Sequence, residues 1–141
     1  MDKISMSAPD LDESEIKEVT EVLRSGRLAL GPKAQEFEKG IADYVGRNYG
    51  VAVSSGTAGL HILIRALDIK EGDEVLVPSF TFSSTVNVVL YERAKPVFVD
   101  INADTYTIDP EDMEGKITKR TKAAIVVDVF GHPAEWDEIL E

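Results

Sequence analysis

Apolar residues recur with a helical period over the first part of the chain, and this pattern predicts two helices. In residues 11–24 the apolar side chains share one face: Ile16, Val19, Val22 and Leu23. Asp12 can cap that helix and Ser25-Gly26 ends it. Residues 27–32 lack a helical period and are expected to form a loop. A second helix is expected over about 33–45, with four side chains facing inward: Phe37, Ile41, Tyr44 and Val45.

The pattern changes after residue 46, where short β-rich runs alternate with helical segments. We expect strands at 49–54, 73–77, 96–100 and 123–129, and helices at 57–67, at 81–92, from Asp109 and from Pro133. This alternation predicts an α/β fold, an α-β-α sandwich with a mostly parallel sheet. Residues 1–46 are then the leading helices with their loop. Residues 47–141 are the alternating part, which lacks a closing element and is expected to be incomplete.

Composition narrows the classes of function. The net charge of −11 argues against nucleic-acid binding and against a basic helix on a membrane surface. The absence of cysteine excludes disulfides, thiolate catalysis and Cys-ligated zinc. The N-terminus does not resemble a signal peptide, and no apolar run approaches the ~20 residues of a membrane helix. The expected compartment is the cytoplasm.

The candidate chemistry lies at two turns between strand and helix. A Ser-Ser-Gly-Thr turn, residues 54–57, opens an apolar helix, whose free N–H groups and positive end favour a phosphate. Glycine allows close approach, and the hydroxyls of Ser55 and Thr57 add hydrogen bonds. The next such turn, 77–83, carries aromatic residues. Together the turns suit a phosphorylated planar ring. A capped helix start and a core aromatic residue at Phe82 are the simpler alternatives.

A series of motifs extends along nearly the whole chain: Ser25-Gly26, Gly31-Pro32, Phe37-Glu38, Ser55–Leu60, Gly72–Val75, Val77–Phe82, Pro96–Ile101, Thr107–Pro110, Thr118–Lys122 and Gly131–Ala134. In order and spacing these motifs resemble the N-terminal part of the large domain of the pyridoxal-phosphate (PLP) dependent sugar aminotransferases of the DegT/DnrJ type, which have fold type I. The resemblance implies an enzyme that aminates a nucleotide-linked keto-sugar with an amino-acid donor, for polysaccharide biosynthesis, as a homodimer.

The resemblance also implies roles for individual residues. The PLP phosphate would lie on Gly56, Thr57 and Ala58, and Phe82 would stack on the pyridine ring. The loop 25–32 would lie near the substrate entrance, where Arg27 could meet a nucleotide phosphate; a plain surface charge is the alternative. His132, in a loop after a strand end, is a further candidate for substrate binding, with a structural role as its alternative.

The central acid–base chemistry is expected outside this sequence. The family's lysine, and the acid that partners the pyridinium N–H, fall beyond Glu141, so the chain is expected to be an N-terminal fragment that is inactive alone. A PLP-dependent sugar dehydratase of the same fold remains an alternative, because it differs at the lysine position. A non-enzymatic regulatory domain is another. A Rossmann dehydrogenase is excluded, since no Gly-x-Gly-x-x-Gly follows the first strand.

Overall fold

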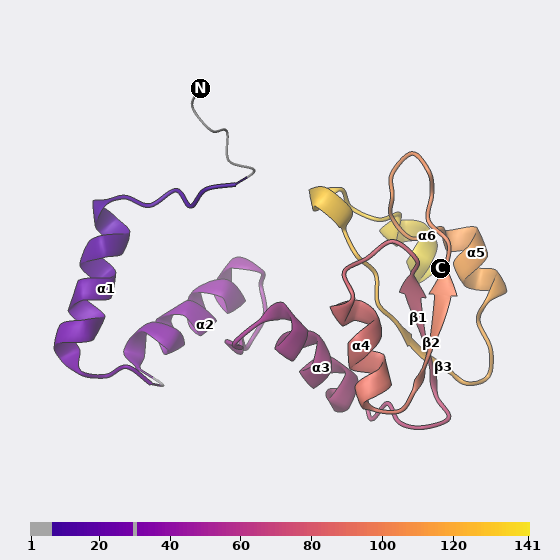
Figure 1. Ribbon diagram of the computed structural model, residues 1–141, viewed down its shortest axis with the longest axis horizontal. Coiled ribbons are helices and arrows are strands. Elements are labelled where there is room, and N and C mark those ends of the chain that lie inside the picture. Colours follow the sequence, from indigo (N-terminus) through magenta and orange to yellow (C-terminus); the bar gives the residue numbers. More distant parts are fainter. Residues whose placement is uncertain (1–6, 30) are drawn as a thin grey trace. The chain divides into compact units, whose positions relative to one another are not determined.

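The structure is a computed structural model that describes residues 7–29 and 31–141 (Figure 1). Residues 1–6 and Leu30, which belong to the expected leading segment and entrance loop, lie outside the described residues. The chain divides into two compact units, Met1–Ala52 and Val53–Glu141.

The first unit holds the two predicted helices, α1 (Glu13–Ser25) and α2 (Pro32–Tyr44). Asp12 caps α1 as predicted: its carboxylate accepts from the N–H of Ser14 at 2.6 Å, and Glu15 reaches back to the N–H of Asp12 at 2.7 Å. Gly26, at φ 69°, ends the helix. The two helices are joined by an ion pair of 2.7 Å between Lys33 and Glu18.

The predicted inward face of α2 is wrong for the described chain. All four of its apolar residues are exposed: Phe37, Ile41, Tyr44 and Val45. In α2 only Ala42 is buried. A periodic apolar face shows which side chains need a partner surface, whereas burial requires that surface to be present. The described residues provide none for this face.

The second unit is built around a parallel sheet of three strands, β1 (Glu74–Pro78), β2 (Lys95–Val99) and β3 (Thr121–Ala124). Their order is β2-β1-β3, and both pairs are parallel. β1 is therefore the central strand, and all five of its residues are buried. The mostly parallel sheet predicted from the alternating pattern is confirmed.

Helices cover both faces of this sheet, so the predicted three-layer architecture is also confirmed (Figure 1). Alternate residues of β1 point to opposite faces. Val75 and Val77 pack with residues of α3 (Gly56–Ala66) and α4 (Ser84–Tyr91). Leu76 packs on the other face with Met113 of α5 (Pro110–Gly115), and Ile139 of α6 (Trp136–Leu140) lies against the same cluster.

Three predicted elements differ from the structure. The strand expected at 49–54 is wrong, because no described strand lies beside this segment to pair with it. The strand expected at 123–129 is paired only as far as Ala124, although the N–H of Ile125 still donates to Leu76 at 2.9 Å. The helix expected from Pro133 begins at Trp136, after a short 3-10 turn, η1 (Val129–Gly131).

A buried carboxylate joins the amino ends of the three strands. Glu74, only 2% exposed, begins β1 and accepts from the hydroxyl of Thr118 at 2.6 Å. It also pairs with Lys95 of β2 at 3.1 Å and with Arg120, next to β3, at 2.6 Å. The Thr118 hydroxyl, followed by Lys95, lowers the pKa of Glu74 to about 2. Glu74 therefore stays ionised and anchors the end of the sheet opposite the carboxyl edge.

Candidate functional site

The Ser-Ser-Gly-Thr turn forms the start of α3, as the sequence predicts. Ser55 is the N-cap, and its hydroxyl accepts from the N–H of Ala58 at 3.1 Å. The backbone carbonyl of Ser55 accepts from Gly59 at 3.1 Å. The N–H groups of Gly56 and Thr57 bind no acceptor among the described residues. Two donors at the positive end of a helix are therefore open to a ligand.

The turn and the aromatic Phe82 border one open pocket of about 560 Å³. It is lined by Gly56, Thr57, Gly59, Leu60, Leu63, Phe82 and Ser84. Phe82 is 76% exposed, so a face of its ring is accessible. A Cβ added to Gly56 would meet no protein atom within 4 Å and would protrude into open space. Open N–H groups, a glycine without Cβ and an accessible aromatic ring fit a phosphate joined to a planar ring.

The loop that carries Phe82 is fixed although its ring is exposed. The hydroxyls of Thr81 and Thr85 are 2.8 Å apart, and Thr85 is 3% exposed. The N–H of Thr85 donates to the carbonyl of Phe82 at 3.0 Å, and the N–H of Ser79 donates to Val99 of β2 at 2.8 Å. The ring of Phe82 is thus presented from a backbone held at both ends.

A polar contact joins α3 to the residue that follows α4. Glu92, just after α4, binds the ring of His61 at 2.7 Å and the guanidinium of Arg65 at 2.9 Å. The ring of Tyr91 lies edge-on to His61, with centroids 5.3 Å apart. The hydrogen bond from His61, followed by that from Arg65, lowers the pKa of Glu92. This contact supports the helix whose first turn borders the pocket.

The remaining candidates lie elsewhere. Arg27 belongs to the first unit, where it lines a hollow of about 270 Å³ with residues of α1 and α2. His132 is exposed, directly after η1, and its N–H donates to the carbonyl of Val129 at 3.0 Å. Asp128, at the end of the extended segment after β3, accepts from the N–H of Ala134 at 3.0 Å. Substrate roles for Arg27 and His132 stay predictions.

The sequence analysis missed a cluster of three aromatic side chains. Phe80 lies 5.8 Å from Tyr106 and 6.3 Å from Phe130, measured between ring centroids. Each residue follows a different strand, so the shared carboxyl edge of a parallel sheet is the signal that could have placed them together.

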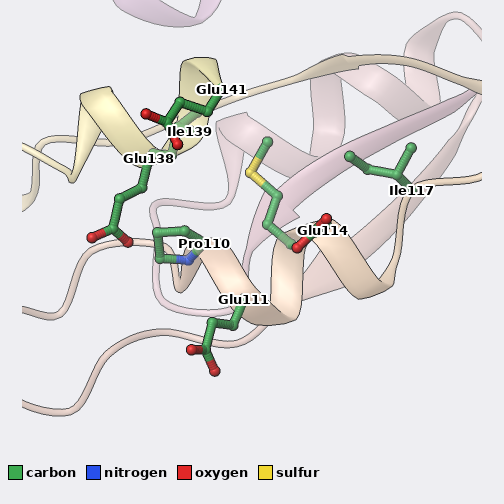
Figure 2. A pocket seen from close by; sticks show the side chains of 8 residues that line it. Pro110, Glu111, Glu114, Ile117, Glu138, Ile139 and Glu141 are labelled. Carbon is green, nitrogen blue, oxygen red and sulfur yellow. The ribbon is translucent and has the colours of Figure 1, made fainter.

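A second hollow, of about 470 Å³, lies between α5 and α6 (Figure 2). Its rim carries four carboxylates: Glu111, Glu114, Glu138 and Glu141. No group of His, Cys, Asp and Glu in the described part of the chain has an arrangement suited to a metal ion. Nor does any described helix have the length and apolarity needed to cross a membrane. The acidic rim is best explained as solvated surface.

Comparisons with known proteins find relatives of this chain. The family model of the DegT/DnrJ/EryC1/StrS aminotransferases matches residues 9–141. The spore coat polysaccharide biosynthesis protein SpsC of Bacillus subtilis is 46% identical over 134 residues, which are 95% of this chain and 34% of that protein. The chain thus spans about a third of the length of the curated relatives it matches.

Solved structures of similar fold include two sugar-modifying enzymes. The putative sugar aminotransferase Spr1654 from Streptococcus pneumoniae, in its PMP form, matches with a TM-score of 0.94 and 38% identity, over 98% of this chain and 35% of that chain. A GDP-4-keto-6-deoxymannose-3-dehydratase matches with a TM-score of 0.92 and 31% identity, over 97% of this chain and 37% of that one.

Proposed function

We propose that this chain, which belongs to the DegT/DnrJ/EryC1/StrS aminotransferase family, supplies the phosphate-binding part of a pyridoxal-phosphate site. The site would serve an enzyme that aminates a nucleotide-linked keto-sugar with an amino-acid donor. The observation that carries the proposal is the pair of open N–H groups at Gly56 and Thr57, facing a pocket shared with Phe82.

The chain's own residues would bind and orient the cofactor. The N–H groups of Gly56 and Thr57 and the hydroxyl of Thr57 would hold the phosphate, with the positive end of α3 behind them. The ring of Phe82 would stack on the pyridine plane and fix its tilt. When bound, PLP supplies an electron sink for amino-group transfer. The Ser55 cap keeps the first turn of α3 in shape for this task.

The substrate class rests on the relatives. SpsC is named for polysaccharide biosynthesis, and the solved neighbours include a sugar aminotransferase and a dehydratase of a GDP-linked keto-sugar. Arg27 is the proposed contact for a nucleotide phosphate, since guanidinium binds phosphate in a bidentate manner. We extend the proposal to a homodimer acting in the cytoplasm. The second candidate function is a PLP-dependent sugar dehydratase, which the likeness to the dehydratase favours.

Phosphate binding at the turn is tested on this chain by NMR. Inorganic phosphate and PLP should shift the amide resonances of Gly56 and Thr57. Gly56→Ala should weaken both ligands, because the new Cβ protrudes where the anion would lie. Thr57→Ala should cost about 1–2 kcal/mol of PLP binding, the value of one hydrogen bond to a charged group.

The matched control is Gly40→Ala, because a Cβ at Gly40 of α2 also meets no atom within 4 Å. This variant should bind PLP as the unchanged chain does. If Gly56→Ala and Thr57→Ala also leave the affinity unchanged, the turn is only a helix cap and the proposed function fails.

The chain alone should be inactive as a transaminase. Incubation with PLP, glutamate and a nucleotide-linked keto-sugar should yield no amino-sugar, because the family's lysine and pyridinium acid are not among these residues. Product is measured by mass spectrometry, with the putative sugar aminotransferase Spr1654 from Streptococcus pneumoniae assayed in parallel. Repeated turnover by the chain would contradict this expectation.

A further inference from the structure

The aromatic cluster of Phe80, Tyr106 and Phe130 is exposed rather than packed into the core. Phe130 is 89% exposed, Tyr106 49% and Phe80 45%. The rings are tilted by 47° and 57° to one another, so they leave accessible faces instead of stacking closed. A group of large aromatic side chains presented to solvent marks a binding surface more often than an isolated one does.

Two of the three aromatic residues have a backbone conformation that aromatic residues rarely adopt. Tyr106 has φ 61° and Phe130 has φ 55°, both in the left-handed region. Two other non-glycine residues have positive φ in the part of the chain that the structure describes, Asp68 and Arg93. Each comes just after the C-cap of a helix, where this conformation is usual. Tyr106 and Phe130 do not follow a helix. Strain of this kind gathers at ligand-binding sites.

The cluster lies at the edge of the sheet where parallel folds bind their ligands. Phe80 follows β1, Tyr106 follows β2, and Phe130 follows β3, so all three rings come from carboxyl ends of strands. Phe80 also shares the short loop 79–83 with Phe82, which borders the phosphate turn. A ligand on the cluster would therefore lie next to the proposed cofactor.

The charge of these loops limits the class of ligand that the cluster can bind. Segments 79–83, 100–109 and 128–132 carry four acids and no lysine or arginine: Asp100, Asp104, Asp109 and Asp128. An anionic group such as a diphosphate is disfavoured there. The carboxylates of Asp100, Asp109 and Asp128 already accept backbone N–H groups, whereas the accessible aromatic faces can pack against C–H groups of a ligand. A sugar ring that carries no charge and presents C–H groups on its face matches the acidic loops and the aromatic surface.

We infer that Phe80, Tyr106 and Phe130 form the surface that binds the pyranose ring of the sugar substrate. The inference rests on the proposed function, because that function requires a sugar carbon beside the cofactor and hence beside Phe82. The nucleotide base would lie beyond the diphosphate, away from the acidic loops. The ligand class is a neutral hexopyranose, either free or linked to a nucleotide.

The test is an NMR titration of this chain, with phenylalanine and tyrosine rings labelled, against methyl glycosides of glucose, galactose and mannose. Saturable shifts are expected at all three rings, with dissociation constants in the millimolar range. Phe130→Ala should weaken binding about fivefold or more. Tyr44→Ala, a control at an equally exposed aromatic residue of α2, should leave it unchanged.

A second variant separates binding from folding. Tyr106→Gly should change the unfolding midpoint little, because glycine adopts φ 61° without strain and this gain offsets the lost packing of a half-exposed ring, yet it should weaken glycoside binding. Loss of binding with a retained midpoint supports the inference. Unchanged binding in both Tyr106→Gly and Phe130→Ala overturns it.

Uridine monophosphate distinguishes the sugar from the base. Tighter binding of this nucleotide than of any glycoside at the three rings would overturn the inference in favour of a base site. No ring shifts with any glycoside up to about 100 mM would overturn it outright. The amide resonances of Gly56 and Thr57 are measured on the same protein with inorganic phosphate added. Their shifts test the proposed function, so its failure is distinguished from a failure of the sugar surface.

Discussion

At the scale of single residues, one carboxylate has an unusual position. Glu74 is buried at the start of the central strand, and its partners come from β2 and from the segment before β3. A buried charge is tolerated only when it is paired and hydrogen-bonded. Removing the charge leaves Lys95 and Arg120 without their shared partner, so Glu74 couples the ends of three strands.

This coupling predicts a specific dependence of stability on pH. The folded pKa of Glu74, about 2, is below its usual value of 4.5. Its contribution is therefore complete above pH 4.5 and is lost as the pH falls towards 2. Glu74→Gln should lower the free energy of unfolding at neutral pH and flatten its acid limb between these values. Urea unfolding at a series of pH values measures both effects.

The control is Glu71→Gln, because the side chain of Glu71 is 78% exposed and meets Arg93 only at 4.0 Å. This variant should keep the acid limb of the unchanged chain. An acid limb unchanged in Glu74→Gln would show that the cluster contributes nothing to the stability of the sheet.

At the scale of elements, helix starts follow closely from local sequence. Asp109 caps α5, and its carboxylate accepts from Glu111 at 3.0 Å and from Asp112 at 3.4 Å. Pro110 at the first helical position favours the same start. A short helix depends strongly on such a cap, because few of its backbone groups are bonded internally.

Asp109→Ala should therefore lower the free energy of unfolding by about 1 kcal/mol. Asp104→Ala is the matched control, since the Asp104 carboxylate lies in the same loop region and caps no helix. Chemical denaturation compares the two variants. Equal stability of both would mean that packing of Met113, and not the cap, holds α5 in place.

Local signals also explain which predictions succeeded. The caps of α1, α3 and α5 involve residues within a few positions of one another, and all three helices were predicted close to their observed starts. The strand at 49–54 failed because a strand is defined by its partner, which local sequence does not show. The apolar face of α2 failed for the same reason.

The difference between local signals and partners distant in the sequence also explains which parts of the site could be predicted. The turn at Gly56 and Thr57 is visible in the sequence because cap, glycine and hydroxyl are adjacent. The aromatic cluster joins Phe80 to residues 26 and 50 positions further along the chain, and the Glu74 cluster reaches 46 positions, so neither has a local pattern. Only the fold brings these side chains together.

At the scale of the whole chain, much apolar surface is exposed. On α3 the exposed side chains include Ile62 and Leu63, and α2 exposes the face that contains Tyr44. The outer strands β2 and β3 each pair on one side only within the described residues. Exposed apolar patches and open strand edges promote association between molecules.

The chain should therefore self-associate as its concentration rises. Light scattering coupled to size-exclusion chromatography should give a mass above that of one 141-residue chain, increasing with concentration. Leu63→Glu should reduce this association by placing a charge on the exposed face of α3, whereas Glu138→Gln on α6 should not. A constant monomer mass over the whole range would contradict the expectation.

The position of Glu74 has a consequence for how such a chain can change in evolution. The polar anchor of the sheet is at the amino ends of the strands, whereas the phosphate turn and the aromatic loops follow the carboxyl ends. Loops at the carboxyl edge can therefore be exchanged without disturbing the anchor. A lineage built on this sheet can acquire new ligands by exchanging exposed residues of these loops, such as Phe80 and Phe130, while selection for folding acts on Glu74 and on buried loop residues such as Ile108.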